Sequence, residues 1–156
     1  MTIAARVEDY LKQNAVEFEL LAHKATGSTH ESAHAAHVPD NHLAKAVMVH
    51  DDQGHAMVVL PGNAWLRLEM LNNASGRAFK LDEESELTDL FPDCTPGAVP
   101  PLGTAYGLET YMDEALTTLA DVYLEAGDHR HLVRVDGSDF ARLSHGAHLG
   151  QFGRRG

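Results

Sequence analysis

The stretch AKAVMVHDDQGHAMVVL, residues 44–60, decides the fold class of this chain. Two runs rich in Val and Met, residues 44–50 and 55–60, flank a polar turn that contains Gly54. Apolar and β-branched runs on either side of such a turn are typical of a β-hairpin. We therefore predict two paired strands here, which the break Pro61-Gly62-Asn63 ends.

The sequence before the hairpin predicts two helices and one strand. Apolar residues at three- and four-residue spacings predict a helix over 2–14 that ends at Asn14. Alternating apolar and acidic residues over 16–21 predict a half-buried strand in which Leu20 faces inward. A short helix that ends at Ala36 is predicted before the hairpin, because Val38-Pro39-Asp40 follows it.

The sequence after the hairpin predicts helices and strands in alternation. Trp65, Leu68 and Leu71 have the spacing of one side of a helix. Asp82 is predicted to cap an acidic helix whose leucines face inward. Strands are predicted over 77–81, 108–112, 120–125 and 131–135, and a last helix over 138–143.

The order of these elements sets the predicted fold class. Strands that are adjacent in some places and separated by helices in others indicate an α+β fold around a mixed sheet. We place this single domain at residues 1–145 and expect a frayed tail over 146–156.

Charge and composition argue against several classes of protein. Twelve Lys+Arg against 23 Asp+Glu give a net charge of −11, which repels nucleic acid at long range and argues against a DNA-binding module. The single cysteine, Cys94, excludes an internal disulfide. No stretch approaches the ~20 apolar residues of a membrane span, and no secretory signal is visible. We expect a reduced, soluble, cytoplasmic protein with no membrane partner.

Lys45 is the first candidate for a functional residue. It opens a predicted strand that is apolar on both faces, so its ammonium group is expected to be partly desolvated. A desolvated charge is a stronger electrostatic partner than a hydrated one. The alternative is a lysine at the solvent-facing end of a strand.

The loop 92–103 is the second candidate, since it holds four of the six prolines. Gly97 and Gly103 permit close backbone approach, and the prolines hold the neighbouring amides in place. Such a loop suits recognition of a small polar group by backbone atoms. The alternative is a tight connection between a helix and a strand.

Three histidines, His30, His34 and His37, have a helical spacing that could gather metal ligands on one face. No His-Glu-x-x-His pattern accompanies them, so surface histidines are the preferred interpretation. We expect no metal and no cofactor, and a histidine-dependent metal protein stays the third interpretation of the sequence.

Taken in order, several segments resemble the YbaK/prolyl-tRNA editing-domain family of aminoacyl-tRNA deacylases. The strand-entry Lys45 and the Gly-x-x-x-Pro-x-Gly loop from Gly97 to Gly103 are the most specific. The resemblance covers roughly residues 3–145. Its other matching segments are His23, Glu31–Ala36, His37–Lys45, Val59–Gly62, Met112–Leu116, Tyr123–Gly127 and Asp139–Leu143.

The resemblance implies hydrolysis of the ester between a wrong amino acid and the 3′-terminal adenosine of a tRNA. It implies that Lys45 orients the tRNA end or the substrate, and that the loop at Gly97 contributes backbone groups. The residues it implies as pocket lining are Ala46, Pro101, Gly103, Glu125, Ala126 and Gly127. Many relatives carry Ser-Gly-Gly where this chain has Glu125-Ala126-Gly127, and a polar residue where it has Ala46, so no amino-acid specificity is assigned.

The implied partner is the 3′ end of an aminoacyl-tRNA, which a synthetase or an elongation factor could deliver. Because the chain is acidic, we expect weak tRNA affinity with a steep salt dependence. The cations available for this contact are Lys24, Lys45, Arg130 and Arg154-Arg155. The runner-up is a catalytically weak or inactive module of the same fold that binds a small ligand, a nucleotide or a protein.

Overall fold

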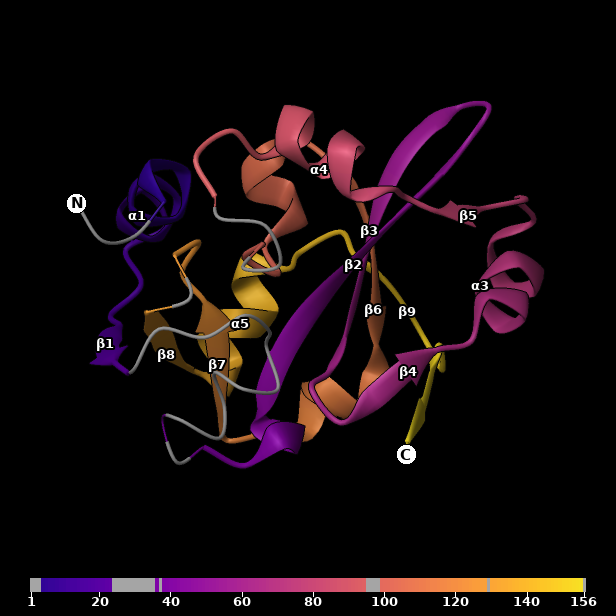
Figure 1. Cartoon of the computed structure of the whole chain (residues 1–156). Helices are drawn as coiled ribbons and strands as arrows, with labels where there is room; N and C mark the ends of the chain where they lie inside the picture. Colours follow the sequence, from indigo (N-terminus) through magenta and orange to yellow (C-terminus); the bar gives the residue numbers. More distant parts are fainter. Residues whose placement is uncertain (1–3, 24–35, 37, 95–98, 129, 156) are drawn as a thin grey trace.

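The hairpin predicted over residues 44–60 forms the centre of the computed structural model (Figure 1). Its strands are β2 (Leu43–Asp51) and β3 (Gly54–Pro61). Gly54 has a φ of +133°, which favours glycine, so the turn between the strands requires this residue. The structure describes residues 4–23, 36, 38–94, 99–128 and 130–155.

Within the described residues, eight strands form one mixed sheet around this hairpin. Their order is β1-β8-β7-β2-β3-β6-β9, and β5 pairs with β2 beside that path. The β2–β7, β3–β6 and β6–β9 pairs are parallel, and the other pairs are antiparallel. The remaining bounds are β1 Glu19–Ala22, β5 Lys80–Leu81, β6 Glu109–Asp113, β7 Asp121–Glu125, β8 His131–Asp136 and β9 His148–Gly150. The predicted α+β fold around a mixed sheet is thereby confirmed.

Helices and a second small sheet cover the main sheet. The second sheet pairs β4 (Ala64–Leu66) with β10 (Gly153–Arg155) in antiparallel fashion. The described helices are α1 Ala5–Gln13, α3 Leu68–Ser75, α4 Glu84–Leu90 and α5 Gly137–Leu143, with short 3-10 helices at Asp40–His42, Gly103–Tyr106 and Glu114–Thr118. In Figure 1, α1 and α3 lie at opposite sides of the molecule. None of the described helices is long and apolar enough to cross a membrane.

Strand alternation divides the buried residues between the two faces of the hairpin. Met48 and Met57 lie opposite each other and pack in a cluster with residues of α1 and α5. Val49 and Ala56 face the other way, into a cluster that contains Leu71 of α3. A third, small buried cluster contains Val38, Leu43 and Leu132.

Several local predictions hold. The first helix ends at Asn14, the strands after Leu108 occur in the predicted order, and α5 matches the last predicted helix. The acidic helix begins one residue later than predicted, because Glu83 and not Asp82 is its N-cap and forms a capping box with Glu86. The short helix predicted before Ala36 lies outside the described residues.

Two local predictions are wrong at the level of single residues. Trp65 does not lie on the inner side of a helix, because residues 64–66 form β4 and the indole is 68% exposed. Leu20 is 47% exposed, while Leu21 packs against a buried cluster instead. Strand β1 starts only at Glu19, so the alternation predicted from residue 16 does not continue through it.

The prediction of a frayed tail from Gly146 onward is also wrong. β9 extends the main sheet beside β6, and β10 pairs with β4. Phe152 between them is only 2% exposed and belongs to the same cluster as Leu71. Burial of a phenylalanine is worth about 1.5–3 kcal/mol, and it adds to the two strand pairs in holding the segment in place.

Candidate substrate-binding site

Lys45 lies between two of the buried clusters. Its neighbour on the same face of β2, Leu43, belongs to the small cluster with Val38, whereas Leu60, directly opposite on β3, belongs to the cluster with Leu71. The lysine side chain is half-buried. Burial lowers the pKa of Lys45, and the nearby carboxylate of Asp40 partly opposes this shift. The predicted desolvation of Lys45 is therefore present.

The indole of Trp65 lies beside this lysine. Lys45 Nζ is 5.2 Å from the ring centroid, within the range of a cation–π interaction. Ala64 on one side of Trp65 is buried and Leu66 on the other is half-buried, so strand alternation turns the tryptophan outward. A large aromatic face thus stands next to a partly desolvated cation.

Arg154 is paired with the same tryptophan across the small sheet. It is the cross-strand neighbour of Trp65 in the β4–β10 pair, and its side chain is exposed. Directly opposite residues in an antiparallel pair have Cβ atoms about 4.5–5.5 Å apart. Lys45, Trp65 and Arg154 together form what we call the basic–aromatic patch. Within the described part of the chain, neither Lys45 nor Arg154 forms an ion pair.

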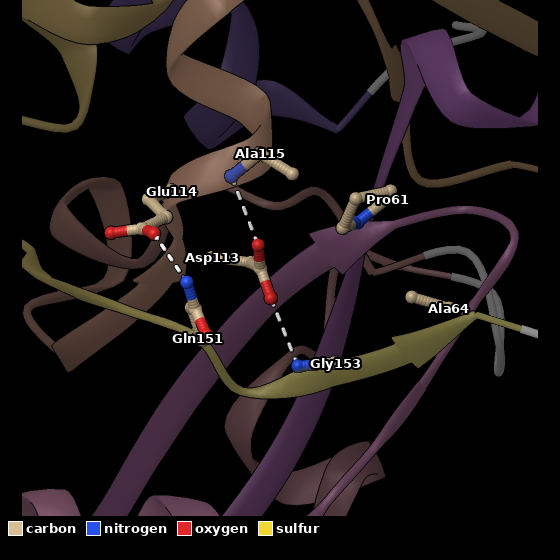
Figure 2. Close-up of a pocket in the computed structure, with 7 residues that line it drawn as sticks. All are labelled: Pro61, Ala64, Asp113, Glu114, Ala115, Gln151 and Gly153. Carbon is tan, nitrogen blue, oxygen red and sulfur yellow. Dashed lines mark hydrogen bonds between the residues drawn. The ribbon is translucent and has the colours of Figure 1, made fainter.

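A buried carboxylate anchors the segment that carries Arg154. Asp113 accepts hydrogen bonds from the backbone N–H groups of Phe152 (3.1 Å), Gly153 (2.9 Å) and Ala115 (2.9 Å). Figure 2 shows this carboxylate at the wall of a hollow of about 360 Å³. The lining residues are Pro61, Ala64, Asp113, Glu114, Ala115, Gln151 and Gly153, none of which the sequence singled out for the site. Since three N–H donors already occupy its oxygens, Asp113 positions β10 and the patch.

The edge of β2 beside Lys45 is open where two neighbouring strands stop short. β7 pairs with β2 only at Leu43 and Ala44, and β5 pairs only at Val49 and His50. Among the described strands, none pairs with residues 45–48 on this edge. Lys45 and the half-buried Ala46 therefore lie at an interruption in the sheet.

Glu125 closes β7 next to this interruption. Its side chain is 1% exposed, and it lies opposite Leu132 on β8. By the alternation of the paired strands, Glu125 and Lys45 point to the same face of the sheet. The structure therefore brings Glu125 and Lys45 to one face of adjacent strands.

The described end of the glycine loop lies on the opposite face. Gly103 begins a 3-10 helix, and a Cβ added to it would meet Thr110 Oγ1 at 2.1 Å and Met57 Cβ at 3.5 Å. Met57 faces away from Lys45, so Gly103 does not share the face of the lysine. Pro101 is buried in the same loop. Gly97 lies outside the described residues.

Packing accounts for Ala126 and Gly127. Ala126 is fully buried, and its carbonyl accepts a hydrogen bond from the Ala4 N–H at 2.8 Å. Gly127 has a φ of +104°, and an added Cβ would lie 2.9 Å from Ala4 Cβ and 3.4 Å from Cys94 Sγ. These two positions need small residues because the start of α1 and the loop at Cys94 press against them.

Sequence reasoning identifies Lys45 but misses the aromatic part of the patch. It predicts a helix interior for Trp65 and a frayed end for Arg154. One signal is available, since Trp65 is the chain's only tryptophan and follows closely after the break Pro61-Gly62-Asn63. Of the other predicted cations, Arg130 is exposed in the β7–β8 turn, and Lys24 lies outside the described residues.

Residues 23–143 match the sequence model of the aminoacyl-tRNA editing domain. Solved structures share the fold. A candidate trans-editing enzyme for prolyl-tRNA synthetase superposes with a TM-score of 0.84 at 23% identity, covering 97% of this chain and 96% of that one. The hypothetical protein APE2540 gives a TM-score of 0.83 at 24% identity, covering 96% and 99%. A candidate signal transduction protein from Marinobacter aquaeolei gives 0.79 at 23% identity, covering 95% of this chain but 30% of that one. No curated protein matches the sequence significantly.

Proposed function

The chain belongs to the aminoacyl-tRNA editing domain family, and from that premise we propose that it hydrolyses mischarged aminoacyl-tRNA in trans. The reaction cleaves the ester between a wrong amino acid and the 3′-terminal adenosine. Such editing is needed because a synthetase pocket gains only about 1–3 kcal/mol of discrimination per methylene group.

The basic–aromatic patch is the observation that carries this proposal. Single-stranded nucleic acid is held by aromatic side chains that stack on bases and by cations that contact the backbone. Trp65 offers its exposed face to the terminal adenine, while Lys45 and Arg154 flank it for the phosphates. On a chain with a net charge of −11, these cations favour entry of a nucleic-acid end at this place.

Lys45 has a second role in the proposed chemistry. An aminoacyl ester is already activated, so the site needs to position a water and to stabilise the negative charge that develops on the carbonyl oxygen. A half-buried ammonium group stabilises that charge better than a hydrated one. We assign Glu125, on the same face of the sheet as Lys45, to the wall of the substrate site, and Gly97 remains the proposed source of backbone donors.

The test is a deacylation assay across a panel of mischarged tRNAs. We expect Lys45→Ala to lower kcat/KM by about 10²–10³-fold, the usual cost of removing one donor to a developing oxyanion. Lys12→Ala is the matched control, because Lys12 is an exposed lysine on α1 that pairs with Glu8 on its own helix. Failure to cleave any ester, or equal rates for Lys45→Ala and wild type, would refute the proposed mechanism.

A binding module without catalysis is the second candidate. Ala46 and Ala126 favour it, because neither carries a side-chain hydroxyl for catalysis. The packing around Gly127 favours it too, since that packing explains the glycine without any catalytic role. This candidate predicts that a tRNA 3′-end mimic binds at the patch and weakens when Lys45 is removed, while no ester on the panel is cleaved. The two candidates therefore differ in turnover and agree in binding.

A further inference from the structure

A second polar cluster lies at the far end of the central hairpin. His50 and His55 are directly opposite each other across β2 and β3, with ring centroids 5.7 Å apart. Both rings turn toward Asp82, which precedes α4. His50 Nδ1 lies 2.6 Å from one carboxylate oxygen of Asp82, and His55 Nδ1 lies 2.8 Å from the other.

This cluster is separate from the basic–aromatic patch. His50 is five residues beyond Lys45 on the same strand, a separation of roughly 16 Å at the usual rise per residue. An odd separation along a strand also places the two side chains on opposite faces. The proposed editing reaction therefore does not account for the cluster.

We propose that His50, His55 and Asp82 form a binding site for a divalent transition-metal ion, with zinc as the best match. Their ligand atoms lie within 4.8 Å of one another. In a tetrahedral zinc site with ligands at about 2.0–2.2 Å, neighbouring ligand atoms are about 3.3 Å apart. The contacts run from His50 Nδ1 to one Asp82 oxygen (2.6 Å) and from His55 Nδ1 to the other (2.8 Å), so each imidazole would need to move about 0.5–0.7 Å farther from its own oxygen to admit the ion.

The donor set and its surroundings suit this ion. Imidazole nitrogen and carboxylate oxygen are common zinc ligands, and three protein ligands leave a position for water or a fourth residue. Glu86 Oε2 lies 3.8 Å from His50 Nδ1, but it accepts the capping-box hydrogen bond from the Glu83 N–H at 2.7 Å, so the fourth position is left to water. The histidine side chains are 32% exposed, so an ion can reach them from solvent.

The rigidity of Asp82 supports a preformed site. Its side chain is 1% exposed, and its backbone N–H donates to the Met48 carbonyl at 3.0 Å. Without metal, each imidazole can donate its Nδ1 proton to this carboxylate. A ring that binds the ion through Nδ1 carries its remaining proton on Nε2. The bound ion would connect the tip of the hairpin to the start of α4.

Zinc binding to the full chain, measured by competition with a colorimetric chelator, tests the proposal. Wild type should bind one equivalent, and His50→Gln and His55→Gln should each lower the affinity at least tenfold. His131→Gln should not change it, because His131 makes a similar 2.8 Å contact with Asp128 but as a single pair. Cobalt in place of zinc should give a tetrahedral absorption spectrum that His55→Gln removes.

Two further variants serve as controls. One distinguishes the loss of a zinc ligand from unfolding, and the other tests whether zinc binds at a different group of histidines. His55→Cys keeps a zinc ligand and should restore binding relative to His55→Gln, which a merely unfolded variant could not do. A variant with His30, His34 and His37 all changed to Gln should retain the wild-type affinity. Absence of binding in wild type, or stoichiometric binding that survives the combined loss of His50 and His55, would overturn the proposal.

Discussion

Removal of the Trp65 side chain is the sharpest perturbation of the proposed site. Base–aromatic stacking contributes about 1–3 kcal/mol per base in alanine-substitution data. At about 1.4 kcal/mol per factor of ten, Trp65→Ala should weaken binding of a tRNA 3′-end mimic by about 5- to 150-fold. Because the indole is 68% exposed, the fold should lose little, within about 0.5 kcal/mol for a typical surface change.

The assay can read the contact directly, because Trp65 is the only tryptophan of the chain. Titration of wild type with an aminoacyl-tRNA mimic that has an amide in place of the ester should change the intrinsic fluorescence as adenine stacks on the indole. The dissociation constant from this titration is compared with that of Trp65→Ala from a labelled mimic. Trp65→Phe keeps an aromatic face and should fall between the two.

Leu149→Ala is the matched control for loss of exposed apolar surface. Leu149 is 57% exposed on β9, which pairs with β6 and not with β4, and its truncation should leave binding unchanged. The stacking argument is refuted if Trp65→Ala binds the mimic within twofold of wild type. It is equally refuted if saturating mimic leaves the tryptophan emission unaltered.

Three other predictions concern strain and titration. Gly127→Ala should destabilise by about 2–6 kcal/mol, because positive φ and overpacking each cost about 1–3 kcal/mol. Gly76→Ala, at φ +69° with nothing within 4 Å, should cost only about 1–2 kcal/mol, and equal losses in urea unfolding would contradict this. Hydrogen bonds from Arg77 lower the pKa of Asp51 from 3.8 to about 2. The melting temperature of Arg77→Met should therefore lie below that of wild type by a full amount above pH 3.8, and this difference should shrink toward pH 2. A difference that stays constant over this pH range would count against the argument. Burial lowers the pKa of Lys45 below 10.5, so mimic affinity should fall with rising pH before that value, whereas Lys45→Arg should show no such fall.

The central sheet could be predicted because its signals are local. The hairpin, β7 and β8 are each encoded by a run of apolar residues and a turn with glycine or aspartate nearby. Their pairing needs no information from distant segments, since the strands β2–β3 and β7–β8 are neighbours in sequence. Lys45 can be identified for the same reason, because its burial follows from the apolar strand that surrounds it.

The larger errors lie where a distant segment decides the local structure. Residues 64–66 form a strand because residues 153–155 pair with them, and neither segment alone is long enough to indicate a strand. The three-residue spacing from Trp65 to Leu68 fits a helix, so periodicity alone could not distinguish a helix from a strand at Trp65. Lys45 and Arg154 can be listed as cations from sequence, but their association with Trp65 cannot, because Trp65 and Arg154 meet through two segments whose predicted structures are both wrong.

The acidic charge of the chain explains why the patch combines cations with an aromatic ring. A net charge of −11 opposes the approach of RNA, and ions in solution screen this repulsion beyond about 8 Å at physiological salt. The attraction of Lys45 and Arg154 for phosphates weakens with salt in the same way. Stacking on Trp65 is short-ranged and carries no charge, so it supplies the share of affinity that salt leaves in place. In the proposed function, a site built in this way holds only the end of a tRNA, and holds it weakly enough that a delivering protein would decide which tRNAs reach it.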